Sequence, residues 1–70
     1  MKNKVKGARV VLGITQATLA KKVGVSRQTI NAIESGNYNL STALALKIAF
    51  MFEKSIHELF ELEVSDWENK

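Results

Sequence analysis

The chain contains no cysteine and no proline among its 70 residues, and no acidic residue precedes Glu34. Without cysteine, neither a disulfide nor a thiolate metal site can stabilise the fold, and an oxidising compartment is not implied. No apolar run approaches the ~20 residues of a transmembrane helix, and the apolar stretch at residues 10–14 is too short for a signal peptide. We therefore expect one small cytoplasmic domain with no membrane partner.

The charges that are present are divided unevenly along the chain. Up to Ile33 there are seven cationic residues and no acidic one, whereas all seven carboxylates lie from Glu34 onward, among three lysines. The formal net charge of +3 thus divides into about +7 and −4. A strongly basic half indicates a polyanion as partner.

Apolar spacing and capping residues predict five helices, at residues 2–12, 16–23, 27–34, 42–52 and 56–60. The predicted N-caps are Thr15, Ser26, Ser41 and Ser55, the last forming a capping box with Glu58, and the predicted stops are Gly13, Gly24 and Gly36. Alternation with a period of two occurs only at residues 62–64, the one place that allows a short C-terminal strand. The expected fold class is a compact all-α domain over residues 1–61, followed by a tail over residues 62–70.

The second and third predicted helices are joined by a turn of specific composition. Ala20 is small enough for two backbones to approach, and Gly24 takes a conformation that a side chain resists. Val25 fills the gap between the helices, and Ser26 restarts helical hydrogen bonding at once. A helix held out by such a turn fits the major groove of DNA.

The sequence closely resembles the Cro/phage-repressor-type helix-turn-helix family of bacterial regulators over roughly residues 5–62. The residues that carry the resemblance are Gly13-Ile14-Thr15-Gln16, Leu19-Ala20, Gly24-Val25-Ser26-Arg27-Gln28-Thr29-Ile30, Ile33-Glu34-Ser35-Gly36, Tyr38-Asn39, Leu44-Ala45-Leu46-Lys47-Ile48-Ala49 and Leu59-Phe60. It implies a lambda-repressor-like DNA-binding domain. The chain departs from the family pattern at Gly7, where a helix former is usual, at Leu40, often proline, and at Phe50, usually polar.

The face of the third predicted helix that would read bases follows from a helical wheel. The buried direction bisects Ile30 and Ile33, so the opposite pole carries Gln28, Asn31 and Ala32, with Arg27 on a flank. Glutamine can bond adenine in bidentate fashion and arginine can bond guanine, each worth ~1–3 kcal/mol of discrimination. The alternative is that Gln28 is simply solvated.

Phosphate contacts are expected around this helix. The resemblance implies that Gln16 holds a phosphate and braces Gln28. Asn37 and Asn39 would offer amides or backbone N–H groups, or else act only as turn formers. Lys6 and Lys21 are candidate salt-sensitive contacts, with a solvated cationic face as the alternative.

Arg9 is expected to have a structural role. On the wheel it is partly buried, and in the resembled family an arginine at this place commonly pairs with a glutamate at the position of Glu34. We therefore predict an ion pair that braces the first helix on the third, with phosphate contact as the alternative.

Catalysis has little support in the sequence. His57 is the only histidine and lacks a second metal ligand, Ser26, Ser41 and Ser55 are accounted for as caps, and no Gly-rich phosphate loop occurs. We predict no enzymatic activity, no metal or cofactor, and no small-molecule effector.

The fourth predicted helix carries more apolar residues than its own core needs. Leu44, Ile48, Met51 and Phe52 can face the core, whereas Leu46 and Phe50 lie on another side. An exposed apolar patch usually marks an interface, here completed by tail residues Leu62, Val64 and Trp67. The alternative is that Phe50 packs under the tail of its own chain.

Together these features predict a sequence-specific, DNA-binding transcriptional regulator, a repressor acting as a homodimer on a palindromic operator. The alternative is an antitoxin-type protein-interaction module that also regulates its own synthesis by binding DNA. Only about ten residues follow Phe60, which disfavours a separate toxin-binding region.

Overall fold

Capping side chains begin the helices of the computed structural model, which describes residues 1–68. The hydroxyls of Thr15, Ser26, Ser41 and Ser55 accept hydrogen bonds from backbone N–H groups three residues later. The helices are α1 (Val5–Leu12), α2 (Gln16–Val23), α3 (Arg27–Glu34), α4 (Thr42–Phe52), α5 (Ile56–Leu59) and α6 (Val64–Trp67). Helices α2, α3 and α4 match the ranges that the sequence predicts.

One apolar core joins helices α1 to α5. Its largest fully buried side chains are Val5, Leu19, Ile30, Ile33, Ile48 and Leu59, so α1 to α5 each contribute at least one. On α4 the buried face is Leu44, Ala45, Ile48 and Ala49, and Met51 and Phe52 pack against it half-buried. The predicted core face of α4 is therefore the observed one.

A small antiparallel sheet corrects two of the predicted helix boundaries. Strand β1 (Lys2–Asn3) pairs with β2 (Phe60–Glu61), with Lys2 opposite Glu61 and Asn3 opposite Phe60. The first helix therefore begins at Val5 rather than at residue 2, and the fifth ends at Leu59 because Phe60 is extended (φ −128°, ψ 138°). The paired residues are 57 and 59 positions apart in the sequence, so the pairing leaves no local signal and is set by tertiary structure.

The tail differs from prediction as well. The expected strand at residues 62–64 is wrong, because the second strand lies at Phe60–Glu61 and residue 64 begins the short helix α6. The carboxylate Oδ2 of Asp66 accepts from the backbone N–H of Glu63 at 2.8 Å, which caps this single turn. The alternation of apolar and polar residues at 62–64 therefore leads into a capped helical turn and does not mark a strand.

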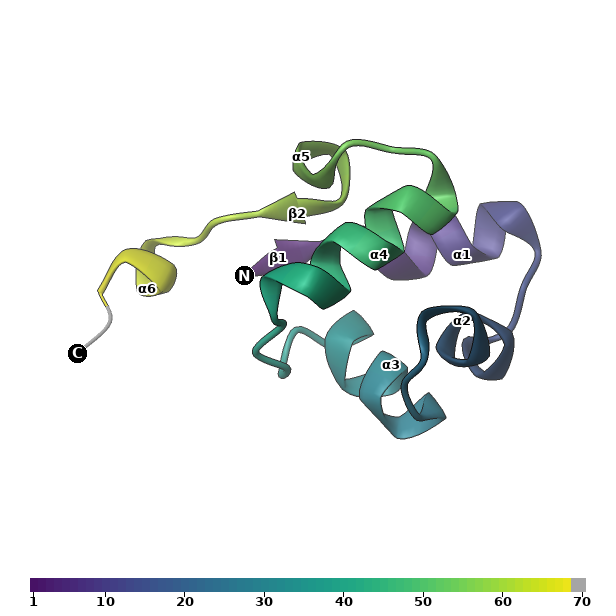
Figure 1. Cartoon of the computed structure of the whole chain (residues 1–70). Helices are drawn as coiled ribbons and strands as arrows, with labels where there is room; N and C mark the ends of the chain where they lie inside the picture. The colour runs from purple at the N-terminus through teal and green to yellow at the C-terminus, as the bar shows by residue number, and fades with distance from the viewer. Residues whose placement is uncertain (69–70) are drawn as a thin grey trace.

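Figure 1 shows how these elements are arranged. Helices α2 and α3 lie together along one side of the molecule, α4 crosses its middle, and α5 lies at the opposite side. Beyond β2 the chain runs away from the helical body, so that α6 stands apart from it. The fold is thus a mostly helical body with an outlying tail.

Candidate nucleic-acid interface

The turn between α2 and α3 positions the candidate reading helix. The N–H groups of Gly24 and Val25 both donate to the carbonyl of Ala20, at 2.9 and 3.0 Å, which closes α2. Gly24 has φ of +79°, a left-handed conformation that favours glycine. Half-buried Val25 packs against the core, and the cap at Ser26 starts α3 directly afterwards. Two buried isoleucines, Ile30 and Ile33, then fix which face of α3 points outward.

The outward face of α3 carries the predicted base-reading residues. Arg27, Gln28 and Asn31 are exposed and Ala32 is half-buried. Within residues 1–68, no intramolecular hydrogen bond engages the side chains of Arg27, Gln28 or Asn31. The N-terminal half of α3 therefore presents one guanidinium and two amides without competing partners.

A buried polar network ties α3 to the first two helices. Glu34 accepts from Arg9 Nε at 2.7 Å and from Arg9 Nη2 at 3.3 Å, with side-chain exposures of 4% for Glu34 and 13% for Arg9. Arg9 Nη1 also donates to the carbonyl of Ile14 at 2.8 Å. The structure thus brings Arg9 and Glu34 together as a largely desolvated ion pair. The Nη1 group of Arg9 bonds the carbonyl of the loop before α2 as well.

Gln16 belongs to the same network. Its Nε2 donates to Glu34 Oε1 at 3.0 Å, and its side chain is half-buried. One amide hydrogen and the backbone N–H at the start of α2 remain for a phosphate, since the first N–H groups of a helix lack internal partners. The expected phosphate contact of Gln16 stays a prediction, now with its side chain anchored on Glu34.

The other predicted phosphate contacts lie on the surface. Lys21 is exposed in the last turn of α2, and Asn37 and Asn39 are exposed in the loop after α3. The backbone N–H of Asn37 donates to Ala32 at 3.0 Å, which leaves its side-chain amide as the available donor. Lys6 is exposed on α1.

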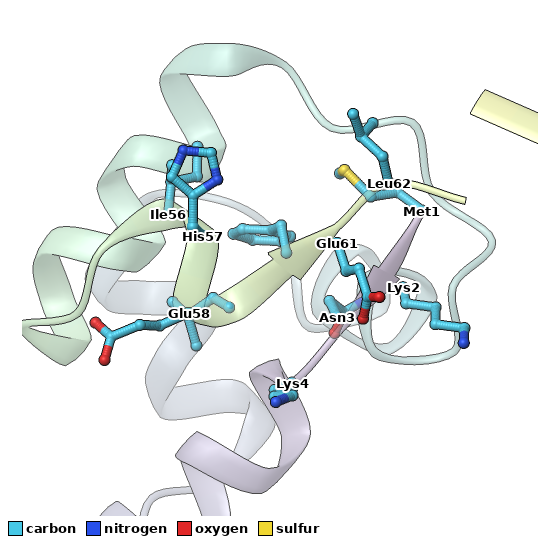
Figure 2. Close-up of a pocket in the computed structure, with 11 residues that line it drawn as sticks. Met1, Lys2, Asn3, Lys4, Ile56, His57, Glu58, Glu61 and Leu62 are labelled. Carbon is cyan, nitrogen blue, oxygen red and sulfur yellow. The ribbon is translucent and has the colours of Figure 1, made fainter. Parts of the chain in front are cut away.

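The N-terminal lysines have acidic neighbours. Lys2 and Lys4 line a groove of about 520 Å³ between β1 and the segment from Ile56 to Leu62. In Figure 2 the side chains of Lys2 and Glu61 lie next to each other across the sheet. The sheet therefore places Lys2, from the basic half of the chain, opposite Glu61, from the acidic half.

The N-terminal amino group of Met1, at one end of the groove beside the sheet, forms ion pairs with the C-terminal tail. The α-amino group of Met1 lies 3.0 Å from Glu63 Oε1 and 3.2 Å from Asp66 Oδ2. Hydrogen bonds to Glu63 and Asp66 raise the pKa of this amino group above its usual value. These contacts join the N-terminus of the chain to α6 and to Glu63, the residue before it.

Asn3 has a role that sequence reasoning missed. Its Oδ1 accepts from the N–H of Val5 at 3.1 Å, and its Nδ2 donates to the carbonyl of Ile33 at 2.8 Å. One side chain therefore caps α1 and satisfies a carbonyl at the end of α3. Asn3 lies inside the helix predicted at residues 2–12, so its bond to the first N–H of α1 was not expected. Its bond to Ile33 joins residues 30 positions apart and has no local signal in the sequence.

Large apolar side chains are exposed at the predicted interface and elsewhere. Phe50 is 85% exposed and Leu46 53% exposed on α4, and Leu62, Val64 and Trp67 are exposed in the tail. Phe50 therefore does not pack under its own tail, which corrects the alternative considered above. The C-terminal turn of α1, with Val10, Val11 and Leu12, is a further exposed apolar surface that the sequence reasoning missed.

Other site classes have few candidates. Among residues 1–68 there is no group of three or more side chains suited to hold a metal ion, and His57 is exposed. None of the helices described in residues 1–68 has the length and hydrophobicity to cross a membrane.

A short helix held out by a tight turn, with free amide and guanidinium groups at its N-terminal end, defines a DNA-binding protein of the helix-turn-helix class. Residues 5–59 match the model of a helix-turn-helix family, and the chain belongs to this family, of the Cro/C1 type. It is a DNA-binding transcriptional regulator.

Relatives and solved structures agree with this assignment. An uncharacterized HTH-type transcriptional regulator of Methanocaldococcus jannaschii is 54% identical over 63 residues, which cover 90% of this chain and 96% of the relative. YgzD of Bacillus subtilis, an uncharacterized regulator of the same type, is 49% identical with the same coverage. The restriction-modification controller protein C.AhdI from Aeromonas hydrophila is similar with a TM-score of 0.75 at 32% identity, covering 81% of this chain and 86% of that protein. The N-terminal DNA-binding domain of SinR from Bacillus subtilis has a TM-score of 0.74 at 26% identity, covering 87% and 90%.

Proposed function

We propose that this regulator is a cytoplasmic repressor that binds a palindromic operator as a homodimer, without catalysis or a cofactor. The observation that carries the proposal is the outward face of α3, where Arg27, Gln28 and Asn31 are exposed and their side chains make no hydrogen bond within residues 1–68. Repression needs no further functional surface besides a DNA-binding one, since a protein that occupies promoter DNA excludes other proteins from it.

Base reading is assigned to the N-terminal half of α3. Gln28 and Asn31 would each bond N6 and N7 of adenine, Arg27 would bond O6 and N7 of guanine, and the methyl group of Ala32 would contact thymine. Gln16, Lys6, Lys21, Asn37 and Asn39 would contact phosphates, which set register and affinity without reading sequence. The proposed operator therefore combines adenine–thymine steps with a guanine in each half-site.

Dimerisation is assigned to the tail and to the exposed side of α4. An eight-residue reading helix offers few base contacts, so such domains bind two half-sites about 34 Å apart. The exposed apolar residues Leu46, Phe50, Leu62, Val64 and Trp67 would supply the contact between copies. Residues 1–61 would then form the DNA-binding domain and residues 62–70 the dimerisation element, of which residues 69 and 70 lie outside the described part.

Selection of bound duplexes from a random pool tests the proposal directly. We expect an inverted repeat whose half-sites are centred one helical turn apart, and a reporter placed behind it should be silenced by the protein. An enriched single half-site would contradict the dimer, and no enrichment would contradict sequence-specific repression. Activation of the reporter would contradict the sign of the regulation.

A further inference from the structure

Gly7 is a helix residue with no explanation inside its own chain. It is the third residue of α1, and the glycines with positive φ are Gly13, Gly24 and Gly36. A Cβ added at Gly7 would meet no heavy atom within 4 Å in the described part of the chain. Glycine inside a helix costs about 0.5–1 kcal/mol relative to alanine. Neither backbone conformation nor internal packing therefore requires glycine here.

Gly7 lies on the wall of an apolar groove of about 800 Å³, which we name the α1 groove. Exposed side chains of Val11 and Leu12 flank it, and half-buried Phe52 closes it. Its full lining is Lys4, Gly7, Ala8, Val11, Leu12, Phe52, Lys54, Glu58 and Leu59. Val11 is 89% exposed, so this groove offers an apolar surface that nothing in the described chain covers.

The α1 groove faces away from the reading helix. At about 100° per residue, Arg9 lies about 160° around the helix from both Gly7 and Val11. Arg9 bonds to Glu34 at the end of α3, so the Gly7–Val11 side of α1 points away from that contact. A partner in the α1 groove would leave the outward face of α3 free for DNA.

We propose that the α1 groove is the docking site for the C-terminal tail of a second copy of this chain. This proposal rests on the homodimer proposed above and specifies where its tail binds. The tail presents three exposed apolar side chains, Leu62, Val64 and Trp67, and in its own chain it leads away from the helical body (Figure 1). The missing side chain at Gly7 lets such a segment approach the backbone of α1 closely.

Charge complementarity favours the tail as the occupant. Residues 61–68 contain Glu61, Glu63, Asp66 and Glu68 and no cationic residue, and the Met1 amino group beside the second and third of these offsets only one of the four charges. The rim of the α1 groove carries two ammonium groups, Lys4 and Lys54, and one carboxylate, Glu58. The Glu58 carboxylate accepts from the backbone N–H of Ser55 at 2.6 Å, which holds it in the capping box of α5. Reciprocal docking of two tails makes two identical contacts and closes the dimer.

Gly7→Ala tests the inference, because its two expected effects have opposite signs. Alanine favours the helix and meets nothing in the monomer, so it should raise the melting temperature of a monomer made by Phe50→Glu with truncation after Glu61. In the full chain the added methyl group should obstruct the tail, raising the dimer dissociation constant about tenfold in sedimentation equilibrium. Gly7→Leu should raise it further. An unchanged dissociation constant in both variants would overturn the inference.

A double-mutant cycle identifies the occupant. If Trp67 of the partner packs on Gly7, the effects of Gly7→Ala and Trp67→Ala on the dissociation constant should be non-additive, whereas Gly7→Ala and Phe50→Ala should be additive. Additivity in the first cycle means that another segment occupies the groove and overturns the inference while leaving the homodimer intact. A wild-type chain that is monomeric at tens of micromolar would overturn both the homodimer and the docking of the tail in the α1 groove. If that monomer still bound the operator, the proposed DNA reading would stand and only the proposed assembly would be wrong.

Discussion

At the scale of single residues, the candidate site separates side chains that read DNA from those that hold the reading helix in place. Gln28 is exposed and its side chain has no hydrogen-bond partner in the described part of the chain, whereas the Glu34 side chain on the same helix is almost fully buried and accepts from Arg9 and Gln16. The two groups should respond to substitution in different assays, the first in DNA binding and the second in folding stability.

Gln28→Ala should weaken binding to the selected operator by about 1–3 kcal/mol and leave binding to random DNA nearly unchanged, because it removes a base contact. Lys21→Ala is the matched phosphate-contact variant. It should weaken binding to both DNAs and reduce the slope of log affinity against log salt by about 1. Fluorescence anisotropy titrations at several salt concentrations measure both. An unchanged operator preference in Gln28→Ala would mean that other residues read the bases.

Arg9→Ala should destabilise the fold far more than Lys6→Ala does. The first change leaves the Glu34 carboxylate buried, with Gln16 still donating to it, and removing one member of a buried pair typically costs about 3–5 kcal/mol. Lys6 is exposed on the same helix, so its truncation should fall within about 0.5 kcal/mol. Urea denaturation of both variants decides the matter, and equal midpoints would assign Arg9 to a surface role.

At the scale of elements, local chemistry explains what the sequence predicts well. Helices α2, α3 and α4 start at Ser or Thr caps, and α1 and α2 end at left-handed glycines, so each of these boundaries is set by residues within one turn. The sheet could not be predicted, because β1 and β2 are two residues each and pair across nearly the whole chain. For the same reason the bond from Asn3 to Ile33 and the α1 groove were invisible, since both join distant segments.

The capping box of α5 should make stability depend on pH. The backbone N–H of Ser55 lowers the pKa of Glu58 below 4.5, its ordinary value. The folded state therefore favours the ionised carboxylate, and its contribution is present above the unfolded pKa and lost as pH falls through the folded pKa. The difference in melting temperature between the wild type and Glu58→Ala should shrink on acidification below about 4.5. Glu53→Ala is the control on an exposed carboxylate, and an identical pH dependence in both variants would contradict the capping role.

At the scale of the whole molecule, the surfaces divide by function. The outward face of α3 is polar, whereas the exposed apolar residues lie on α4, in the tail and at the end of α1. The sequence indicates the first two surfaces through helical spacing, but it does not indicate how they are placed relative to one another, which depends on the packing of α1 to α5. A dimer built from the apolar surfaces would present two reading helices, so its assembly and its DNA binding should fail together.

Phe50→Glu combined with truncation after Glu61 should give a folded monomer that binds the operator much more weakly than the wild type. Phe50 is 85% exposed, and the truncation leaves both strands and the core intact, so folding should persist in circular dichroism. Sedimentation velocity should show a dimer for the wild type at tens of micromolar and a monomer for the variant. Affinity for an isolated half-site should be similar for both, because the outward face of α3 is unchanged. A variant that remains dimeric would assign assembly to another surface.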